Sequence, residues 1–260
     1  MPAILGIDAA WTEHGSSGVA LIFGDAGKLQ VVSAPSYRAF NDLAAGQSHS
    51  PLSSDASLDV GLLLDSAKSL CNGNIDVVAI DMPMSRVKFT SRRGADDLIA
   101  KKYGRHKAST HTPNADRPGP FGAQMTRDFG TCGFPLATES ANASSPALIE
   151  IYPHVALIEL MKCDERRKYK VAKTLTYWKG ESVPNRILAL IKEWDEILRA
   201  LRKELGGFEF DLPDGFSSLA SMKPYEDRLD AIISAWVGLQ FLKGRTTPHG
   251  DDQAAIWVPN

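Results

Sequence analysis

The sequence predicts an α/β fold in which a mixed β-sheet, an antiparallel meander followed by parallel strands, is flanked by helices. The first observation is a set of three apolar segments, residues 3–8, 18–23 and 29–34, separated by short polar connections. Residues 25–28 (Asp-Ala-Gly-Lys) have the composition of a hairpin turn, because glycine tolerates a positive φ. The second observation is an all-apolar run at residues 77–80, typical of a strand buried on both faces.

The segments between and after these strands show helical spacing. Residues 58–70 repeat apolar side chains every three or four positions and end before Asn72-Gly73, the pattern of an amphipathic helix. A strand, a helix and another strand imply a right-handed crossover, so we expect residues 77–80 to pair in parallel with the first strand. Further helices are expected at residues 92–103, 155–161, 185–205 and 224–242, and further strands at 148–152 and 254–258.

Two segments are expected to be loops. Residues 47–57 are polar and rich in serine, and about residues 104–146 are rich in Gly, Pro, Ser, Thr and Asn. A loop as long as the second is unusual unless it is functional or mobile. We therefore predict a single domain over residues 1–260 with a long inserted loop region at about 104–146. A chain of 260 residues is long enough to bury a full core.

Composition and charge narrow the class of protein. The net charge is −2, so a polyanionic partner would have to bind to a local basic patch. The three cysteines, Cys71, Cys132 and Cys163, are far apart and fit no zinc spacing, which favours reduced thiols. The N-terminus has no signal-peptide pattern, and no apolar run is long enough to cross a membrane. These features predict a soluble, cytoplasmic protein.

Four acidic residues carry the functional prediction: Asp8, Asp81, Glu150 and Asp230. Asp8 and Asp81 end apolar strands, Glu150 lies in a strand, and Asp230 lies in the last long helix. If the strands of Asp8 and Asp81 are parallel neighbours, both acids reach the same sheet edge, where ligands of open α/β sheets bind. Carboxylates gathered in this way repel one another unless a cation offsets them, and hard divalent ions prefer oxygen ligands.

We therefore predict catalytic roles for these four acids and a Mg²⁺ or Mn²⁺ site formed by Asp8, Asp81, Asp227 and Asp230. Asp227 and Asp230 are three residues apart, so both can lie on one helix face. Simpler roles remain open: Asp8 as a turn cap, Glu150 as a solvated edge residue, and one helix acid paired with Lys223 or Arg228. Glu226 is expected to be solvated.

A basic stretch follows Asp81 in the sequence. Arg92, Arg93 and Arg105 are the residues in it that we predict to contact substrate phosphates, because cationic side chains hold a nucleic-acid backbone in register. A solvated helix face is the alternative. The second basic patch, which includes Lys170 and Lys173, is expected to be a surface face.

These motifs occur in an order that resembles the ribonuclease H-like superfamily and, more narrowly, the DUF429 family of predicted ribonuclease H-like nucleases. The resemblance spans nearly the whole chain and rests on Gly6-Ile7-Asp8, Val77-Val78-Ala79-Ile80-Asp81-Met82-Pro83, Arg92 with Asp96, Ile149-Glu150-Ile151-Tyr152-Pro153, and Asp227-Arg228-Leu229-Asp230-Ala231. It implies a ribonuclease H-like sheet and a nuclease site. The long segment before Pro146 departs from the simple nuclease pattern and leaves the substrate class open.

Three functions are compatible with these residues. The first is a metal-dependent nuclease, a hydrolase that cleaves the phosphodiester bonds of RNA or DNA. The second is an ATP-dependent phosphotransferase of the actin and sugar-kinase type, in which the turn at residues 9–18 would cradle phosphate. The third is a catalytically silent binding protein with the same fold. We expect the nuclease, with nucleic acid as its partner.

Overall fold

The structure is a computed structural model that describes residues 1–11, 15, 17–25, 27–47, 58–114, 116, 118, 120–140 and 145–260. Seven strands form one mixed sheet in the order β3-β2-β1-β4-β5-β7-β6. The strands are β1 (Ala3–Asp8), β2 (Gly18–Asp25), β3 (Lys28–Ala34), β4 (Val77–Ile80), β5 (Ala147–Glu150), β6 (Thr246–Gly250) and β7 (Ala255–Pro259).

The pairing confirms the predicted meander and the predicted parallel strands. β1 pairs antiparallel with β2, and β2 pairs antiparallel with β3. β4 lies parallel to β1 and β5 lies parallel to β4, as the crossover rule requires. Gly27 has a φ of +95° in the β2–β3 turn, which explains a glycine there.

The helices lie between and after these strands. They are α1 (Tyr37–Ala44), α2 (Val60–Cys71), α3 (Gly94–Tyr103), α4 (Pro120–Thr131), α5 (Pro153–Met161), α6 (Thr174–Tyr177), α7 (Val183–Leu205) and α8 (Lys223–Leu242). Short 3₁₀ turns η1 (Gly104–His106), η2 (Val171–Lys173) and η3 (Ala220–Met222) precede or follow them. Asp59 caps α2, since its side chain accepts a hydrogen bond from the Leu62 amide.

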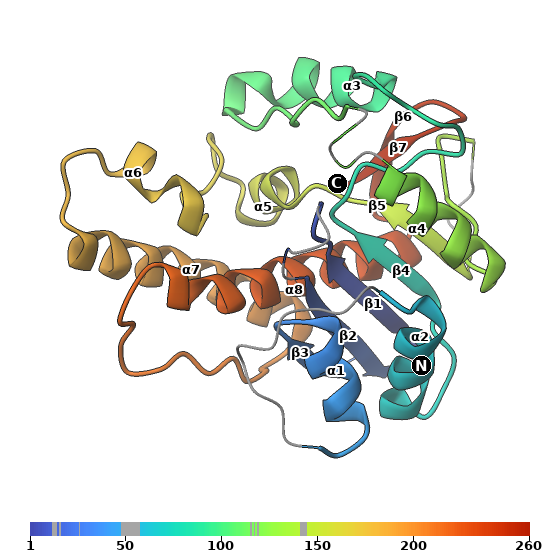
Figure 1. The fold of residues 1–260 in the computed structure, drawn as a ribbon, viewed down its shortest axis with the longest axis horizontal. Helices are drawn as coiled ribbons and strands as arrows, with labels where there is room; N and C mark the ends of the chain where they lie inside the picture. Colours follow the sequence, from blue (N-terminus) through green and yellow to red (C-terminus); the bar gives the residue numbers. More distant parts are fainter. Residues whose placement is uncertain are drawn as a thin grey trace.

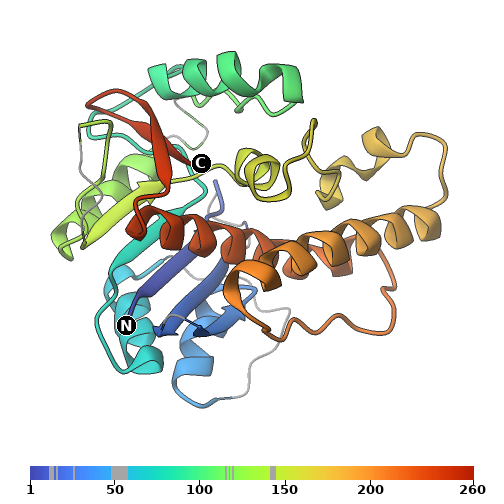
Figure 2. The same cartoon turned by 180° about the vertical axis from the view of Figure 1, so that it is seen from behind.

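Alternating strand residues build a core on each face of the sheet. Ile4, Ala79 and Ile149 belong to the apolar cluster packed under α5, α7 and α8. Ile7, Ile80 and Leu148 belong to the cluster under α1, α2 and α4. The ribbon views show α8 running across one face while α1 and α2 cover the other (Figures 1 and 2). The fold is therefore three layers, helix, sheet and helix.

Helix α8 lies directly on the backbone of the first two strands. A Cβ at Gly6 would come within 2.2 Å of the Ala231 carbonyl oxygen, and one at Gly18 within 1.9 Å of the Asp227 carbonyl oxygen. Only glycine permits so close an approach. The two glycines therefore set α8, and the acids on it, over the carboxyl end of β1.

Three elements differ from the sequence prediction. Helix α1 and strand β6 were not expected, and α4 lies within residues 104–146, which were expected to be loop. Tyr37 and Phe40 bury α1 against the sheet, so packing decides a helix of only eight residues. The serine-rich loop at residues 47–57 lies, from residue 48 on, outside the described residues.

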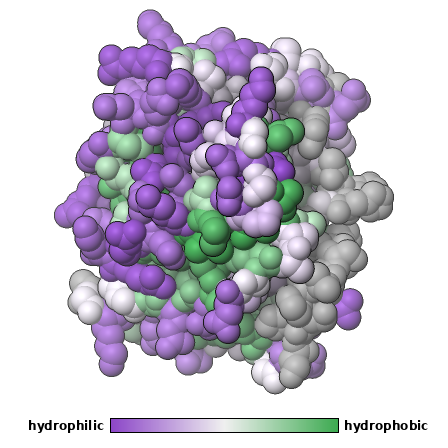
Figure 3. All heavy atoms as spheres, turned by 90° about the vertical axis from the view of Figure 1, so that its left-hand side faces the viewer, coloured by the Kyte–Doolittle hydropathy of each residue, from purple (hydrophilic) through white to green (hydrophobic). Residues whose placement is uncertain are grey.

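No helix in the described part of the chain is both long and apolar enough to span a bilayer. The side on which α6 lies in Figure 1 is mostly hydrophilic, with a hydrophobic patch near its middle (Figure 3). Leu175 in α6 and Leu188 in α7 are exposed by 64% and 66%. Single exposed apolar side chains of this kind are normal on protein surfaces and indicate no particular partner.

Candidate functional site

Asp8 and Asp81 meet at the carboxyl edge of the sheet. Ile7 pairs with Ile80 in the parallel ladder, and the Asp81 amide donates a hydrogen bond of 2.9 Å to the Ile7 carbonyl. Ile4 and Gly6 face α8, so the strand alternation directs Asp8 to that face as well. The same alternation from Val77 and Ala79 directs Asp81 there. Both side chains are partly exposed.

Helix α8 adds three acids over this edge. Glu226, Asp227 and Asp230 are 3%, 0% and 0% exposed, which is rare for carboxylates unless they are paired. Asp227 is the residue whose backbone meets Gly18, beside Asp8 in the β1–β2 ladder. We call Asp8, Asp81, Glu226, Asp227 and Asp230 the carboxylate cluster.

Two lysines bind this cluster. The Lys170 ammonium donates to Asp230 Oδ2 and lies 3.9 Å from Glu226 Oε1. The Lys223 ammonium donates to Asp227 Oδ1 and, over 3.1 Å, to Glu226 Oε1. Tyr169 adds a hydroxyl that donates to Asp230 Oδ1 at 2.6 Å. The helix acids are thus held by groups from the segment before α6 and from the first turn of α8.

Burial and mutual repulsion raise the pKa of the cluster carboxyls. Burial raises the pKa of Asp8 to about 7, with Lys170 opposing and Asp227 adding to the rise. The pKa of Asp230 also rises to about 7, mainly through burial, against the effect of Lys170 and with that of Asp8. For Asp81, burial and then Asp8 raise the pKa well above its ordinary value. Carboxyls of this kind hold protons near neutral pH unless cations replace them.

The cluster contains more carboxyl groups than cations. Five carboxyls face two ammonium groups, so full ionisation would leave three negative charges uncompensated within the cluster. Oxygen donors with surplus charge match a hard divalent cation. Among the described residues, however, no three His, Cys, Asp or Glu side chains stand in a ready-made coordinating arrangement. The donors fit such an ion in type and charge, and Lys170 is the cation that Asp230 contacts.

An open cavity of about 590 Å³ lies over Asp8. Its lining includes Lys173, Lys223, His111, Thr112, Asn114 and Trp11. A smaller cavity of about 30 Å³ shares Trp11 and His111 and reaches Asp81. The cluster is therefore open to a ligand, and lysines line the larger cavity.

The structure places Glu150 on the opposite face of the sheet from the other predicted catalytic acids, although it lines the smaller cavity together with Asp81. In the β4–β5 ladder Glu150 pairs with Ile80, so it points to the opposite face from Asp8 and Asp81. There it accepts hydrogen bonds from Arg93 Nη2 at 2.7 Å, from Arg93 Nη1 at 2.6 Å and from the Met84 amide at 2.8 Å. It is also not an edge residue, because β5 lies between β4 and β7.

Arg93, one of the predicted substrate ligands, is bound within the fold by acidic side chains and also lines the smaller cavity. It is 8% exposed, and its guanidinium also pairs with Asp96 at 3.0 Å and donates to the Met84 carbonyl at 2.6 Å. We call Arg93, Asp96 and Glu150, with the Met84 backbone, the Arg93 network. Its hydrogen bonds connect β5 and α3 to the loop that follows Asp81.

Arg92 and Arg105 are accessible to solvent, but their guanidinium groups form hydrogen bonds with neighbouring residues. Arg92 is partly exposed and bonds to Asp97 at 2.5 Å, to the Asp96 carbonyl at 2.8 Å and to Thr112 at 3.2 Å. Arg105 is exposed and donates to His106 at 2.9 Å. Thr112 lines the cavity over Asp8, so Arg92 borders the site through Thr112, whereas Arg93 lines the smaller cavity directly.

Sequence reasoning missed Lys170 and misplaced Glu226. Lys170 was expected on a surface face and Glu226 in solvent, yet both contact the cluster. The Val171 amide donates to Glu226, which draws this acid into the interior. The available signal was the apolar flanking of Lys170 by Tyr169 and Val171, both of them buried.

Fold and site together define a class, an α/β protein with a mixed seven-stranded sheet and a buried, incompletely compensated group of carboxylates at its carboxyl edge. Within this class the chain belongs to the DUF429 family, described as a protein of unknown function, because residues 6–255 match that family. The family suggested by the sequence motifs is thereby confirmed. No curated protein and no solved structure matches the chain.

Proposed function

We propose that this protein is a ribonuclease H-like, metal-dependent nuclease that hydrolyses phosphodiester bonds of RNA or DNA. The observation that carries the proposal is the excess of carboxyl groups over ammonium groups in the carboxylate cluster, at a sheet edge open to a large cavity. The strand order β3-β2-β1-β4-β5, with its antiparallel meander and parallel continuation, supports the ribonuclease H-like assignment.

In this proposal Asp8, Asp81, Asp227 and Asp230 hold Mg²⁺ or Mn²⁺. Such an ion acts as a Lewis acid that offsets the charge of a phosphodiester in the transition state. Lys170 and Lys223 already neutralise part of the cluster, which lowers the cost of bringing several carboxylates together. Tyr169 orients Asp230 through its hydroxyl.

The cavity over Asp8 would hold the phosphate of the substrate. Lys173 and Lys223 line it, and ammonium groups attract a polyanion and fix its position.

The direct test is cleavage of labelled RNA, DNA and RNA–DNA hybrid by purified protein with Mn²⁺ or Mg²⁺. Asp8→Asn and Asp81→Asn should each lower the rate at least about 100-fold, since an amide is a poor ligand for a hard cation and a poor base. Asp65→Asn is the matched control, because Asp65 is an exposed acid on α2, paired only with Lys68 at 3.4 Å. Its rate should be unchanged.

Cleavage that survives both active-site substitutions would reject the proposal. So would cleavage that is insensitive to a chelator. Thermal stabilisation by ATP, without any cleavage of nucleic acid, would instead favour the phosphotransferase. Residues 12–14 and 16 of the turn considered for phosphate binding lie outside the described part of the chain.

A further inference from the structure

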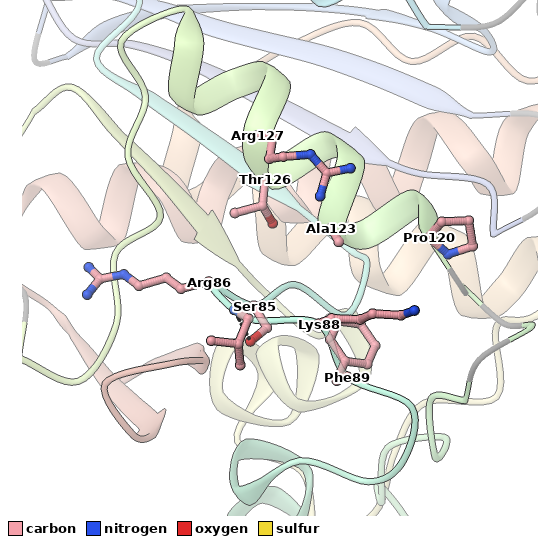
Figure 4. A pocket seen from close by; sticks show the side chains of 9 residues that line it. Ser85, Arg86, Lys88, Phe89, Pro120, Ala123, Thr126 and Arg127 are labelled. Atoms are coloured by element: carbon pink, nitrogen blue, oxygen red, sulfur yellow. Dashed lines mark hydrogen bonds between the residues drawn. The ribbon is translucent and has the colours of Figure 1, made fainter.

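A second pocket, separate from the cavity over Asp8, lies between the loop that follows β4 and helix α4 (Figure 4). It has a volume of about 500 Å³, within the range of sites that hold a small molecule or one unit of a polymer. Residues 85–89 form one wall, and Pro120, Ala123, Thr126 and Arg127 form the other. The proposed hydrolysis makes no use of this pocket.

All charged residues that line the pocket in the described part of the chain are basic: Arg86, Lys88 and Arg127. The Arg86 guanidinium donates to the Leu136 carbonyl at 3.0 Å, and its side chain extends away from the others (Figure 4). Lys88 and Arg127 are exposed, and within the described residues neither forms an ion pair with a carboxylate. Arg127 donates to the neutral Gln124 side chain at 2.7 Å. Two cations therefore border the pocket without a countercharge.

Phe89 supplies an aromatic surface next to Lys88 in this pocket (Figure 4). Its ring is half-buried, and the Arg93 guanidinium lies 5.3 Å from the ring centroid, a cation–π contact. Because Arg93 is itself clamped by Glu150 and Asp96, the ring rests on the rigid Arg93 network. An aromatic ring held in this way is suited to stacking against a flat ligand.

The pocket is tied to the carboxylate cluster through the loop. A Cβ at Gly122 in α4 would lie 2.1 Å from the Pro83 carbonyl oxygen and 3.5 Å from the Phe89 ring. Helix α4 therefore packs directly on Pro83, two residues after Asp81 in the sequence. The loop of residues 82–89 therefore connects Asp81 in the cluster to the wall of the pocket.

We propose that this pocket binds one nucleotide of a single-stranded nucleic acid, with the base stacked on Phe89 and a phosphate between Lys88 and Arg127. The inference rests on the proposed nuclease function and gives the substrate strand a second point of attachment. Stacking on an aromatic side chain combined with cationic contacts to the backbone is the usual way in which single strands are bound. The base must be unpaired to reach the ring, which selects a single strand.

The test measures binding in EDTA, so that it does not depend on cleavage. Fluorescence anisotropy with labelled single-stranded RNA and DNA compares the unchanged protein with Lys88→Glu/Arg127→Glu. The control is Lys192→Glu/Arg199→Glu, which reverses two exposed charges on α7, away from the pocket. We expect the pocket variant to bind at least about tenfold more weakly, with a log–log salt slope smaller in magnitude by about 1.4, the value for two lost contacts to a single strand. The control should match the unchanged protein.

Phe89→Leu separates stacking from charge. It keeps an apolar side chain and both cations, and it should weaken binding about fivefold or more while leaving the salt slope unchanged. Equal binding by the Lys88→Glu/Arg127→Glu variant and the unchanged protein would overturn the proposal, as would no binding by the unchanged protein. A free mononucleotide that binds as tightly as the oligonucleotide would overturn the assignment to a strand.

The binding assay and the cleavage assay test the two proposals independently. If the unchanged protein binds single strands through Lys88 and Arg127 but cleaves none with Mn²⁺, the pocket is supported and the nuclease function is rejected. If Asp8→Asn abolishes cleavage but the pocket variant binds normally, the nuclease function is supported and the pocket is rejected.

Discussion

The carboxylate cluster and the Arg93 network lie at the same edge of the sheet, yet their acids are compensated in different ways. In the network a single guanidinium makes paired hydrogen bonds to Glu150 and to Asp96. In the cluster two ammonium groups face five acids. A planar guanidinium fork fixes carboxylates in one geometry, whereas an ammonium acts as a point charge. The comparison separates acids that hold the fold from acids that remain available for chemistry.

The same difference appears in the pKa of the two groups. Burial raises the pKa of Glu150, but Arg93 opposes the rise by charge and by hydrogen bonding. In the cluster, Asp8 adds to the rise at Asp81 and at Asp230. A neighbouring acid adds to the rise in both groups, at Glu150 through Asp96, and the difference is that Glu150 has a guanidinium bound directly to it.

The largest expected effect comes from breaking the Arg93 network. Arg93→Met leaves Glu150 and Asp96 buried without their cation, which should cost about 3–5 kcal/mol in the free energy of unfolding. Arg92→Met is the matched control, since Arg92 pairs with the exposed Asp97, and it should cost no more than about 1 kcal/mol. Urea unfolding of both variants is the measurement. Equal losses would show that the network does not hold the fold.

The next effect concerns the pH dependence of stability in the metal-free protein. Asp8 has a folded pKa of about 7 against an ordinary value of 3.8. Between these two pH values the folded state holds a proton that the unfolded state has released. Its contribution to stability is present below about pH 4 and is lost as the pH rises through 7. The amide of the Asp8→Asn variant does not titrate, so the variant lacks this contribution to the pH dependence.

We therefore expect the unchanged protein to lose roughly 2–4 kcal/mol relative to Asp8→Asn between pH 4 and pH 8. Urea unfolding in EDTA at intermediate pH values measures the difference. Parallel stability curves for the two proteins would mean that Asp8 has the same pKa in the folded and unfolded states, and would contradict the rise that burial in the cluster produces.

A smaller effect is expected when a divalent ion is added. Mn²⁺ at about 100 times its dissociation constant should stabilise the folded protein by about 2.7 kcal/mol. The effect should disappear in Asp8→Asn/Asp81→Asn and persist in Arg92→Met, because only the first variant removes cluster oxygens. Thermal unfolding with and without Mn²⁺ provides the measurement. Equal stabilisation of all three proteins would place the ion elsewhere.

Much of the fold could be predicted from local patterns. The meander, the parallel strand after α2, and helices α2, α3, α5, α7 and α8 were expected within a few residues of their observed bounds. Hydrophobic periodicity decides such elements, because a long buried face requires it. Strand β6 contains Pro248 and only partly buried or exposed residues, so it has no such pattern, and α1 is too short to show one.

The site was predictable only in part. Asp8, Asp81, Asp227 and Asp230 were chosen because they end strands or share a helix face, and the structure brings them together. Lys170 could not be chosen in this way. It lies in an irregular segment between α5 and α6, and its approach to Asp230 depends on how that segment packs over α8.

What the sequence alone determined is the set of elements and the acids that end them, since apolar periodicity and chain direction are local properties. What only the tertiary structure decided is which acids share a face. Glu150 aligns with Ile80 rather than with Asp81, and a shift of one residue reverses the side of the sheet. Register depends on contacts between distant segments, so it made Glu150 a partner of Arg93 and left Asp8 and Asp81 beside α8.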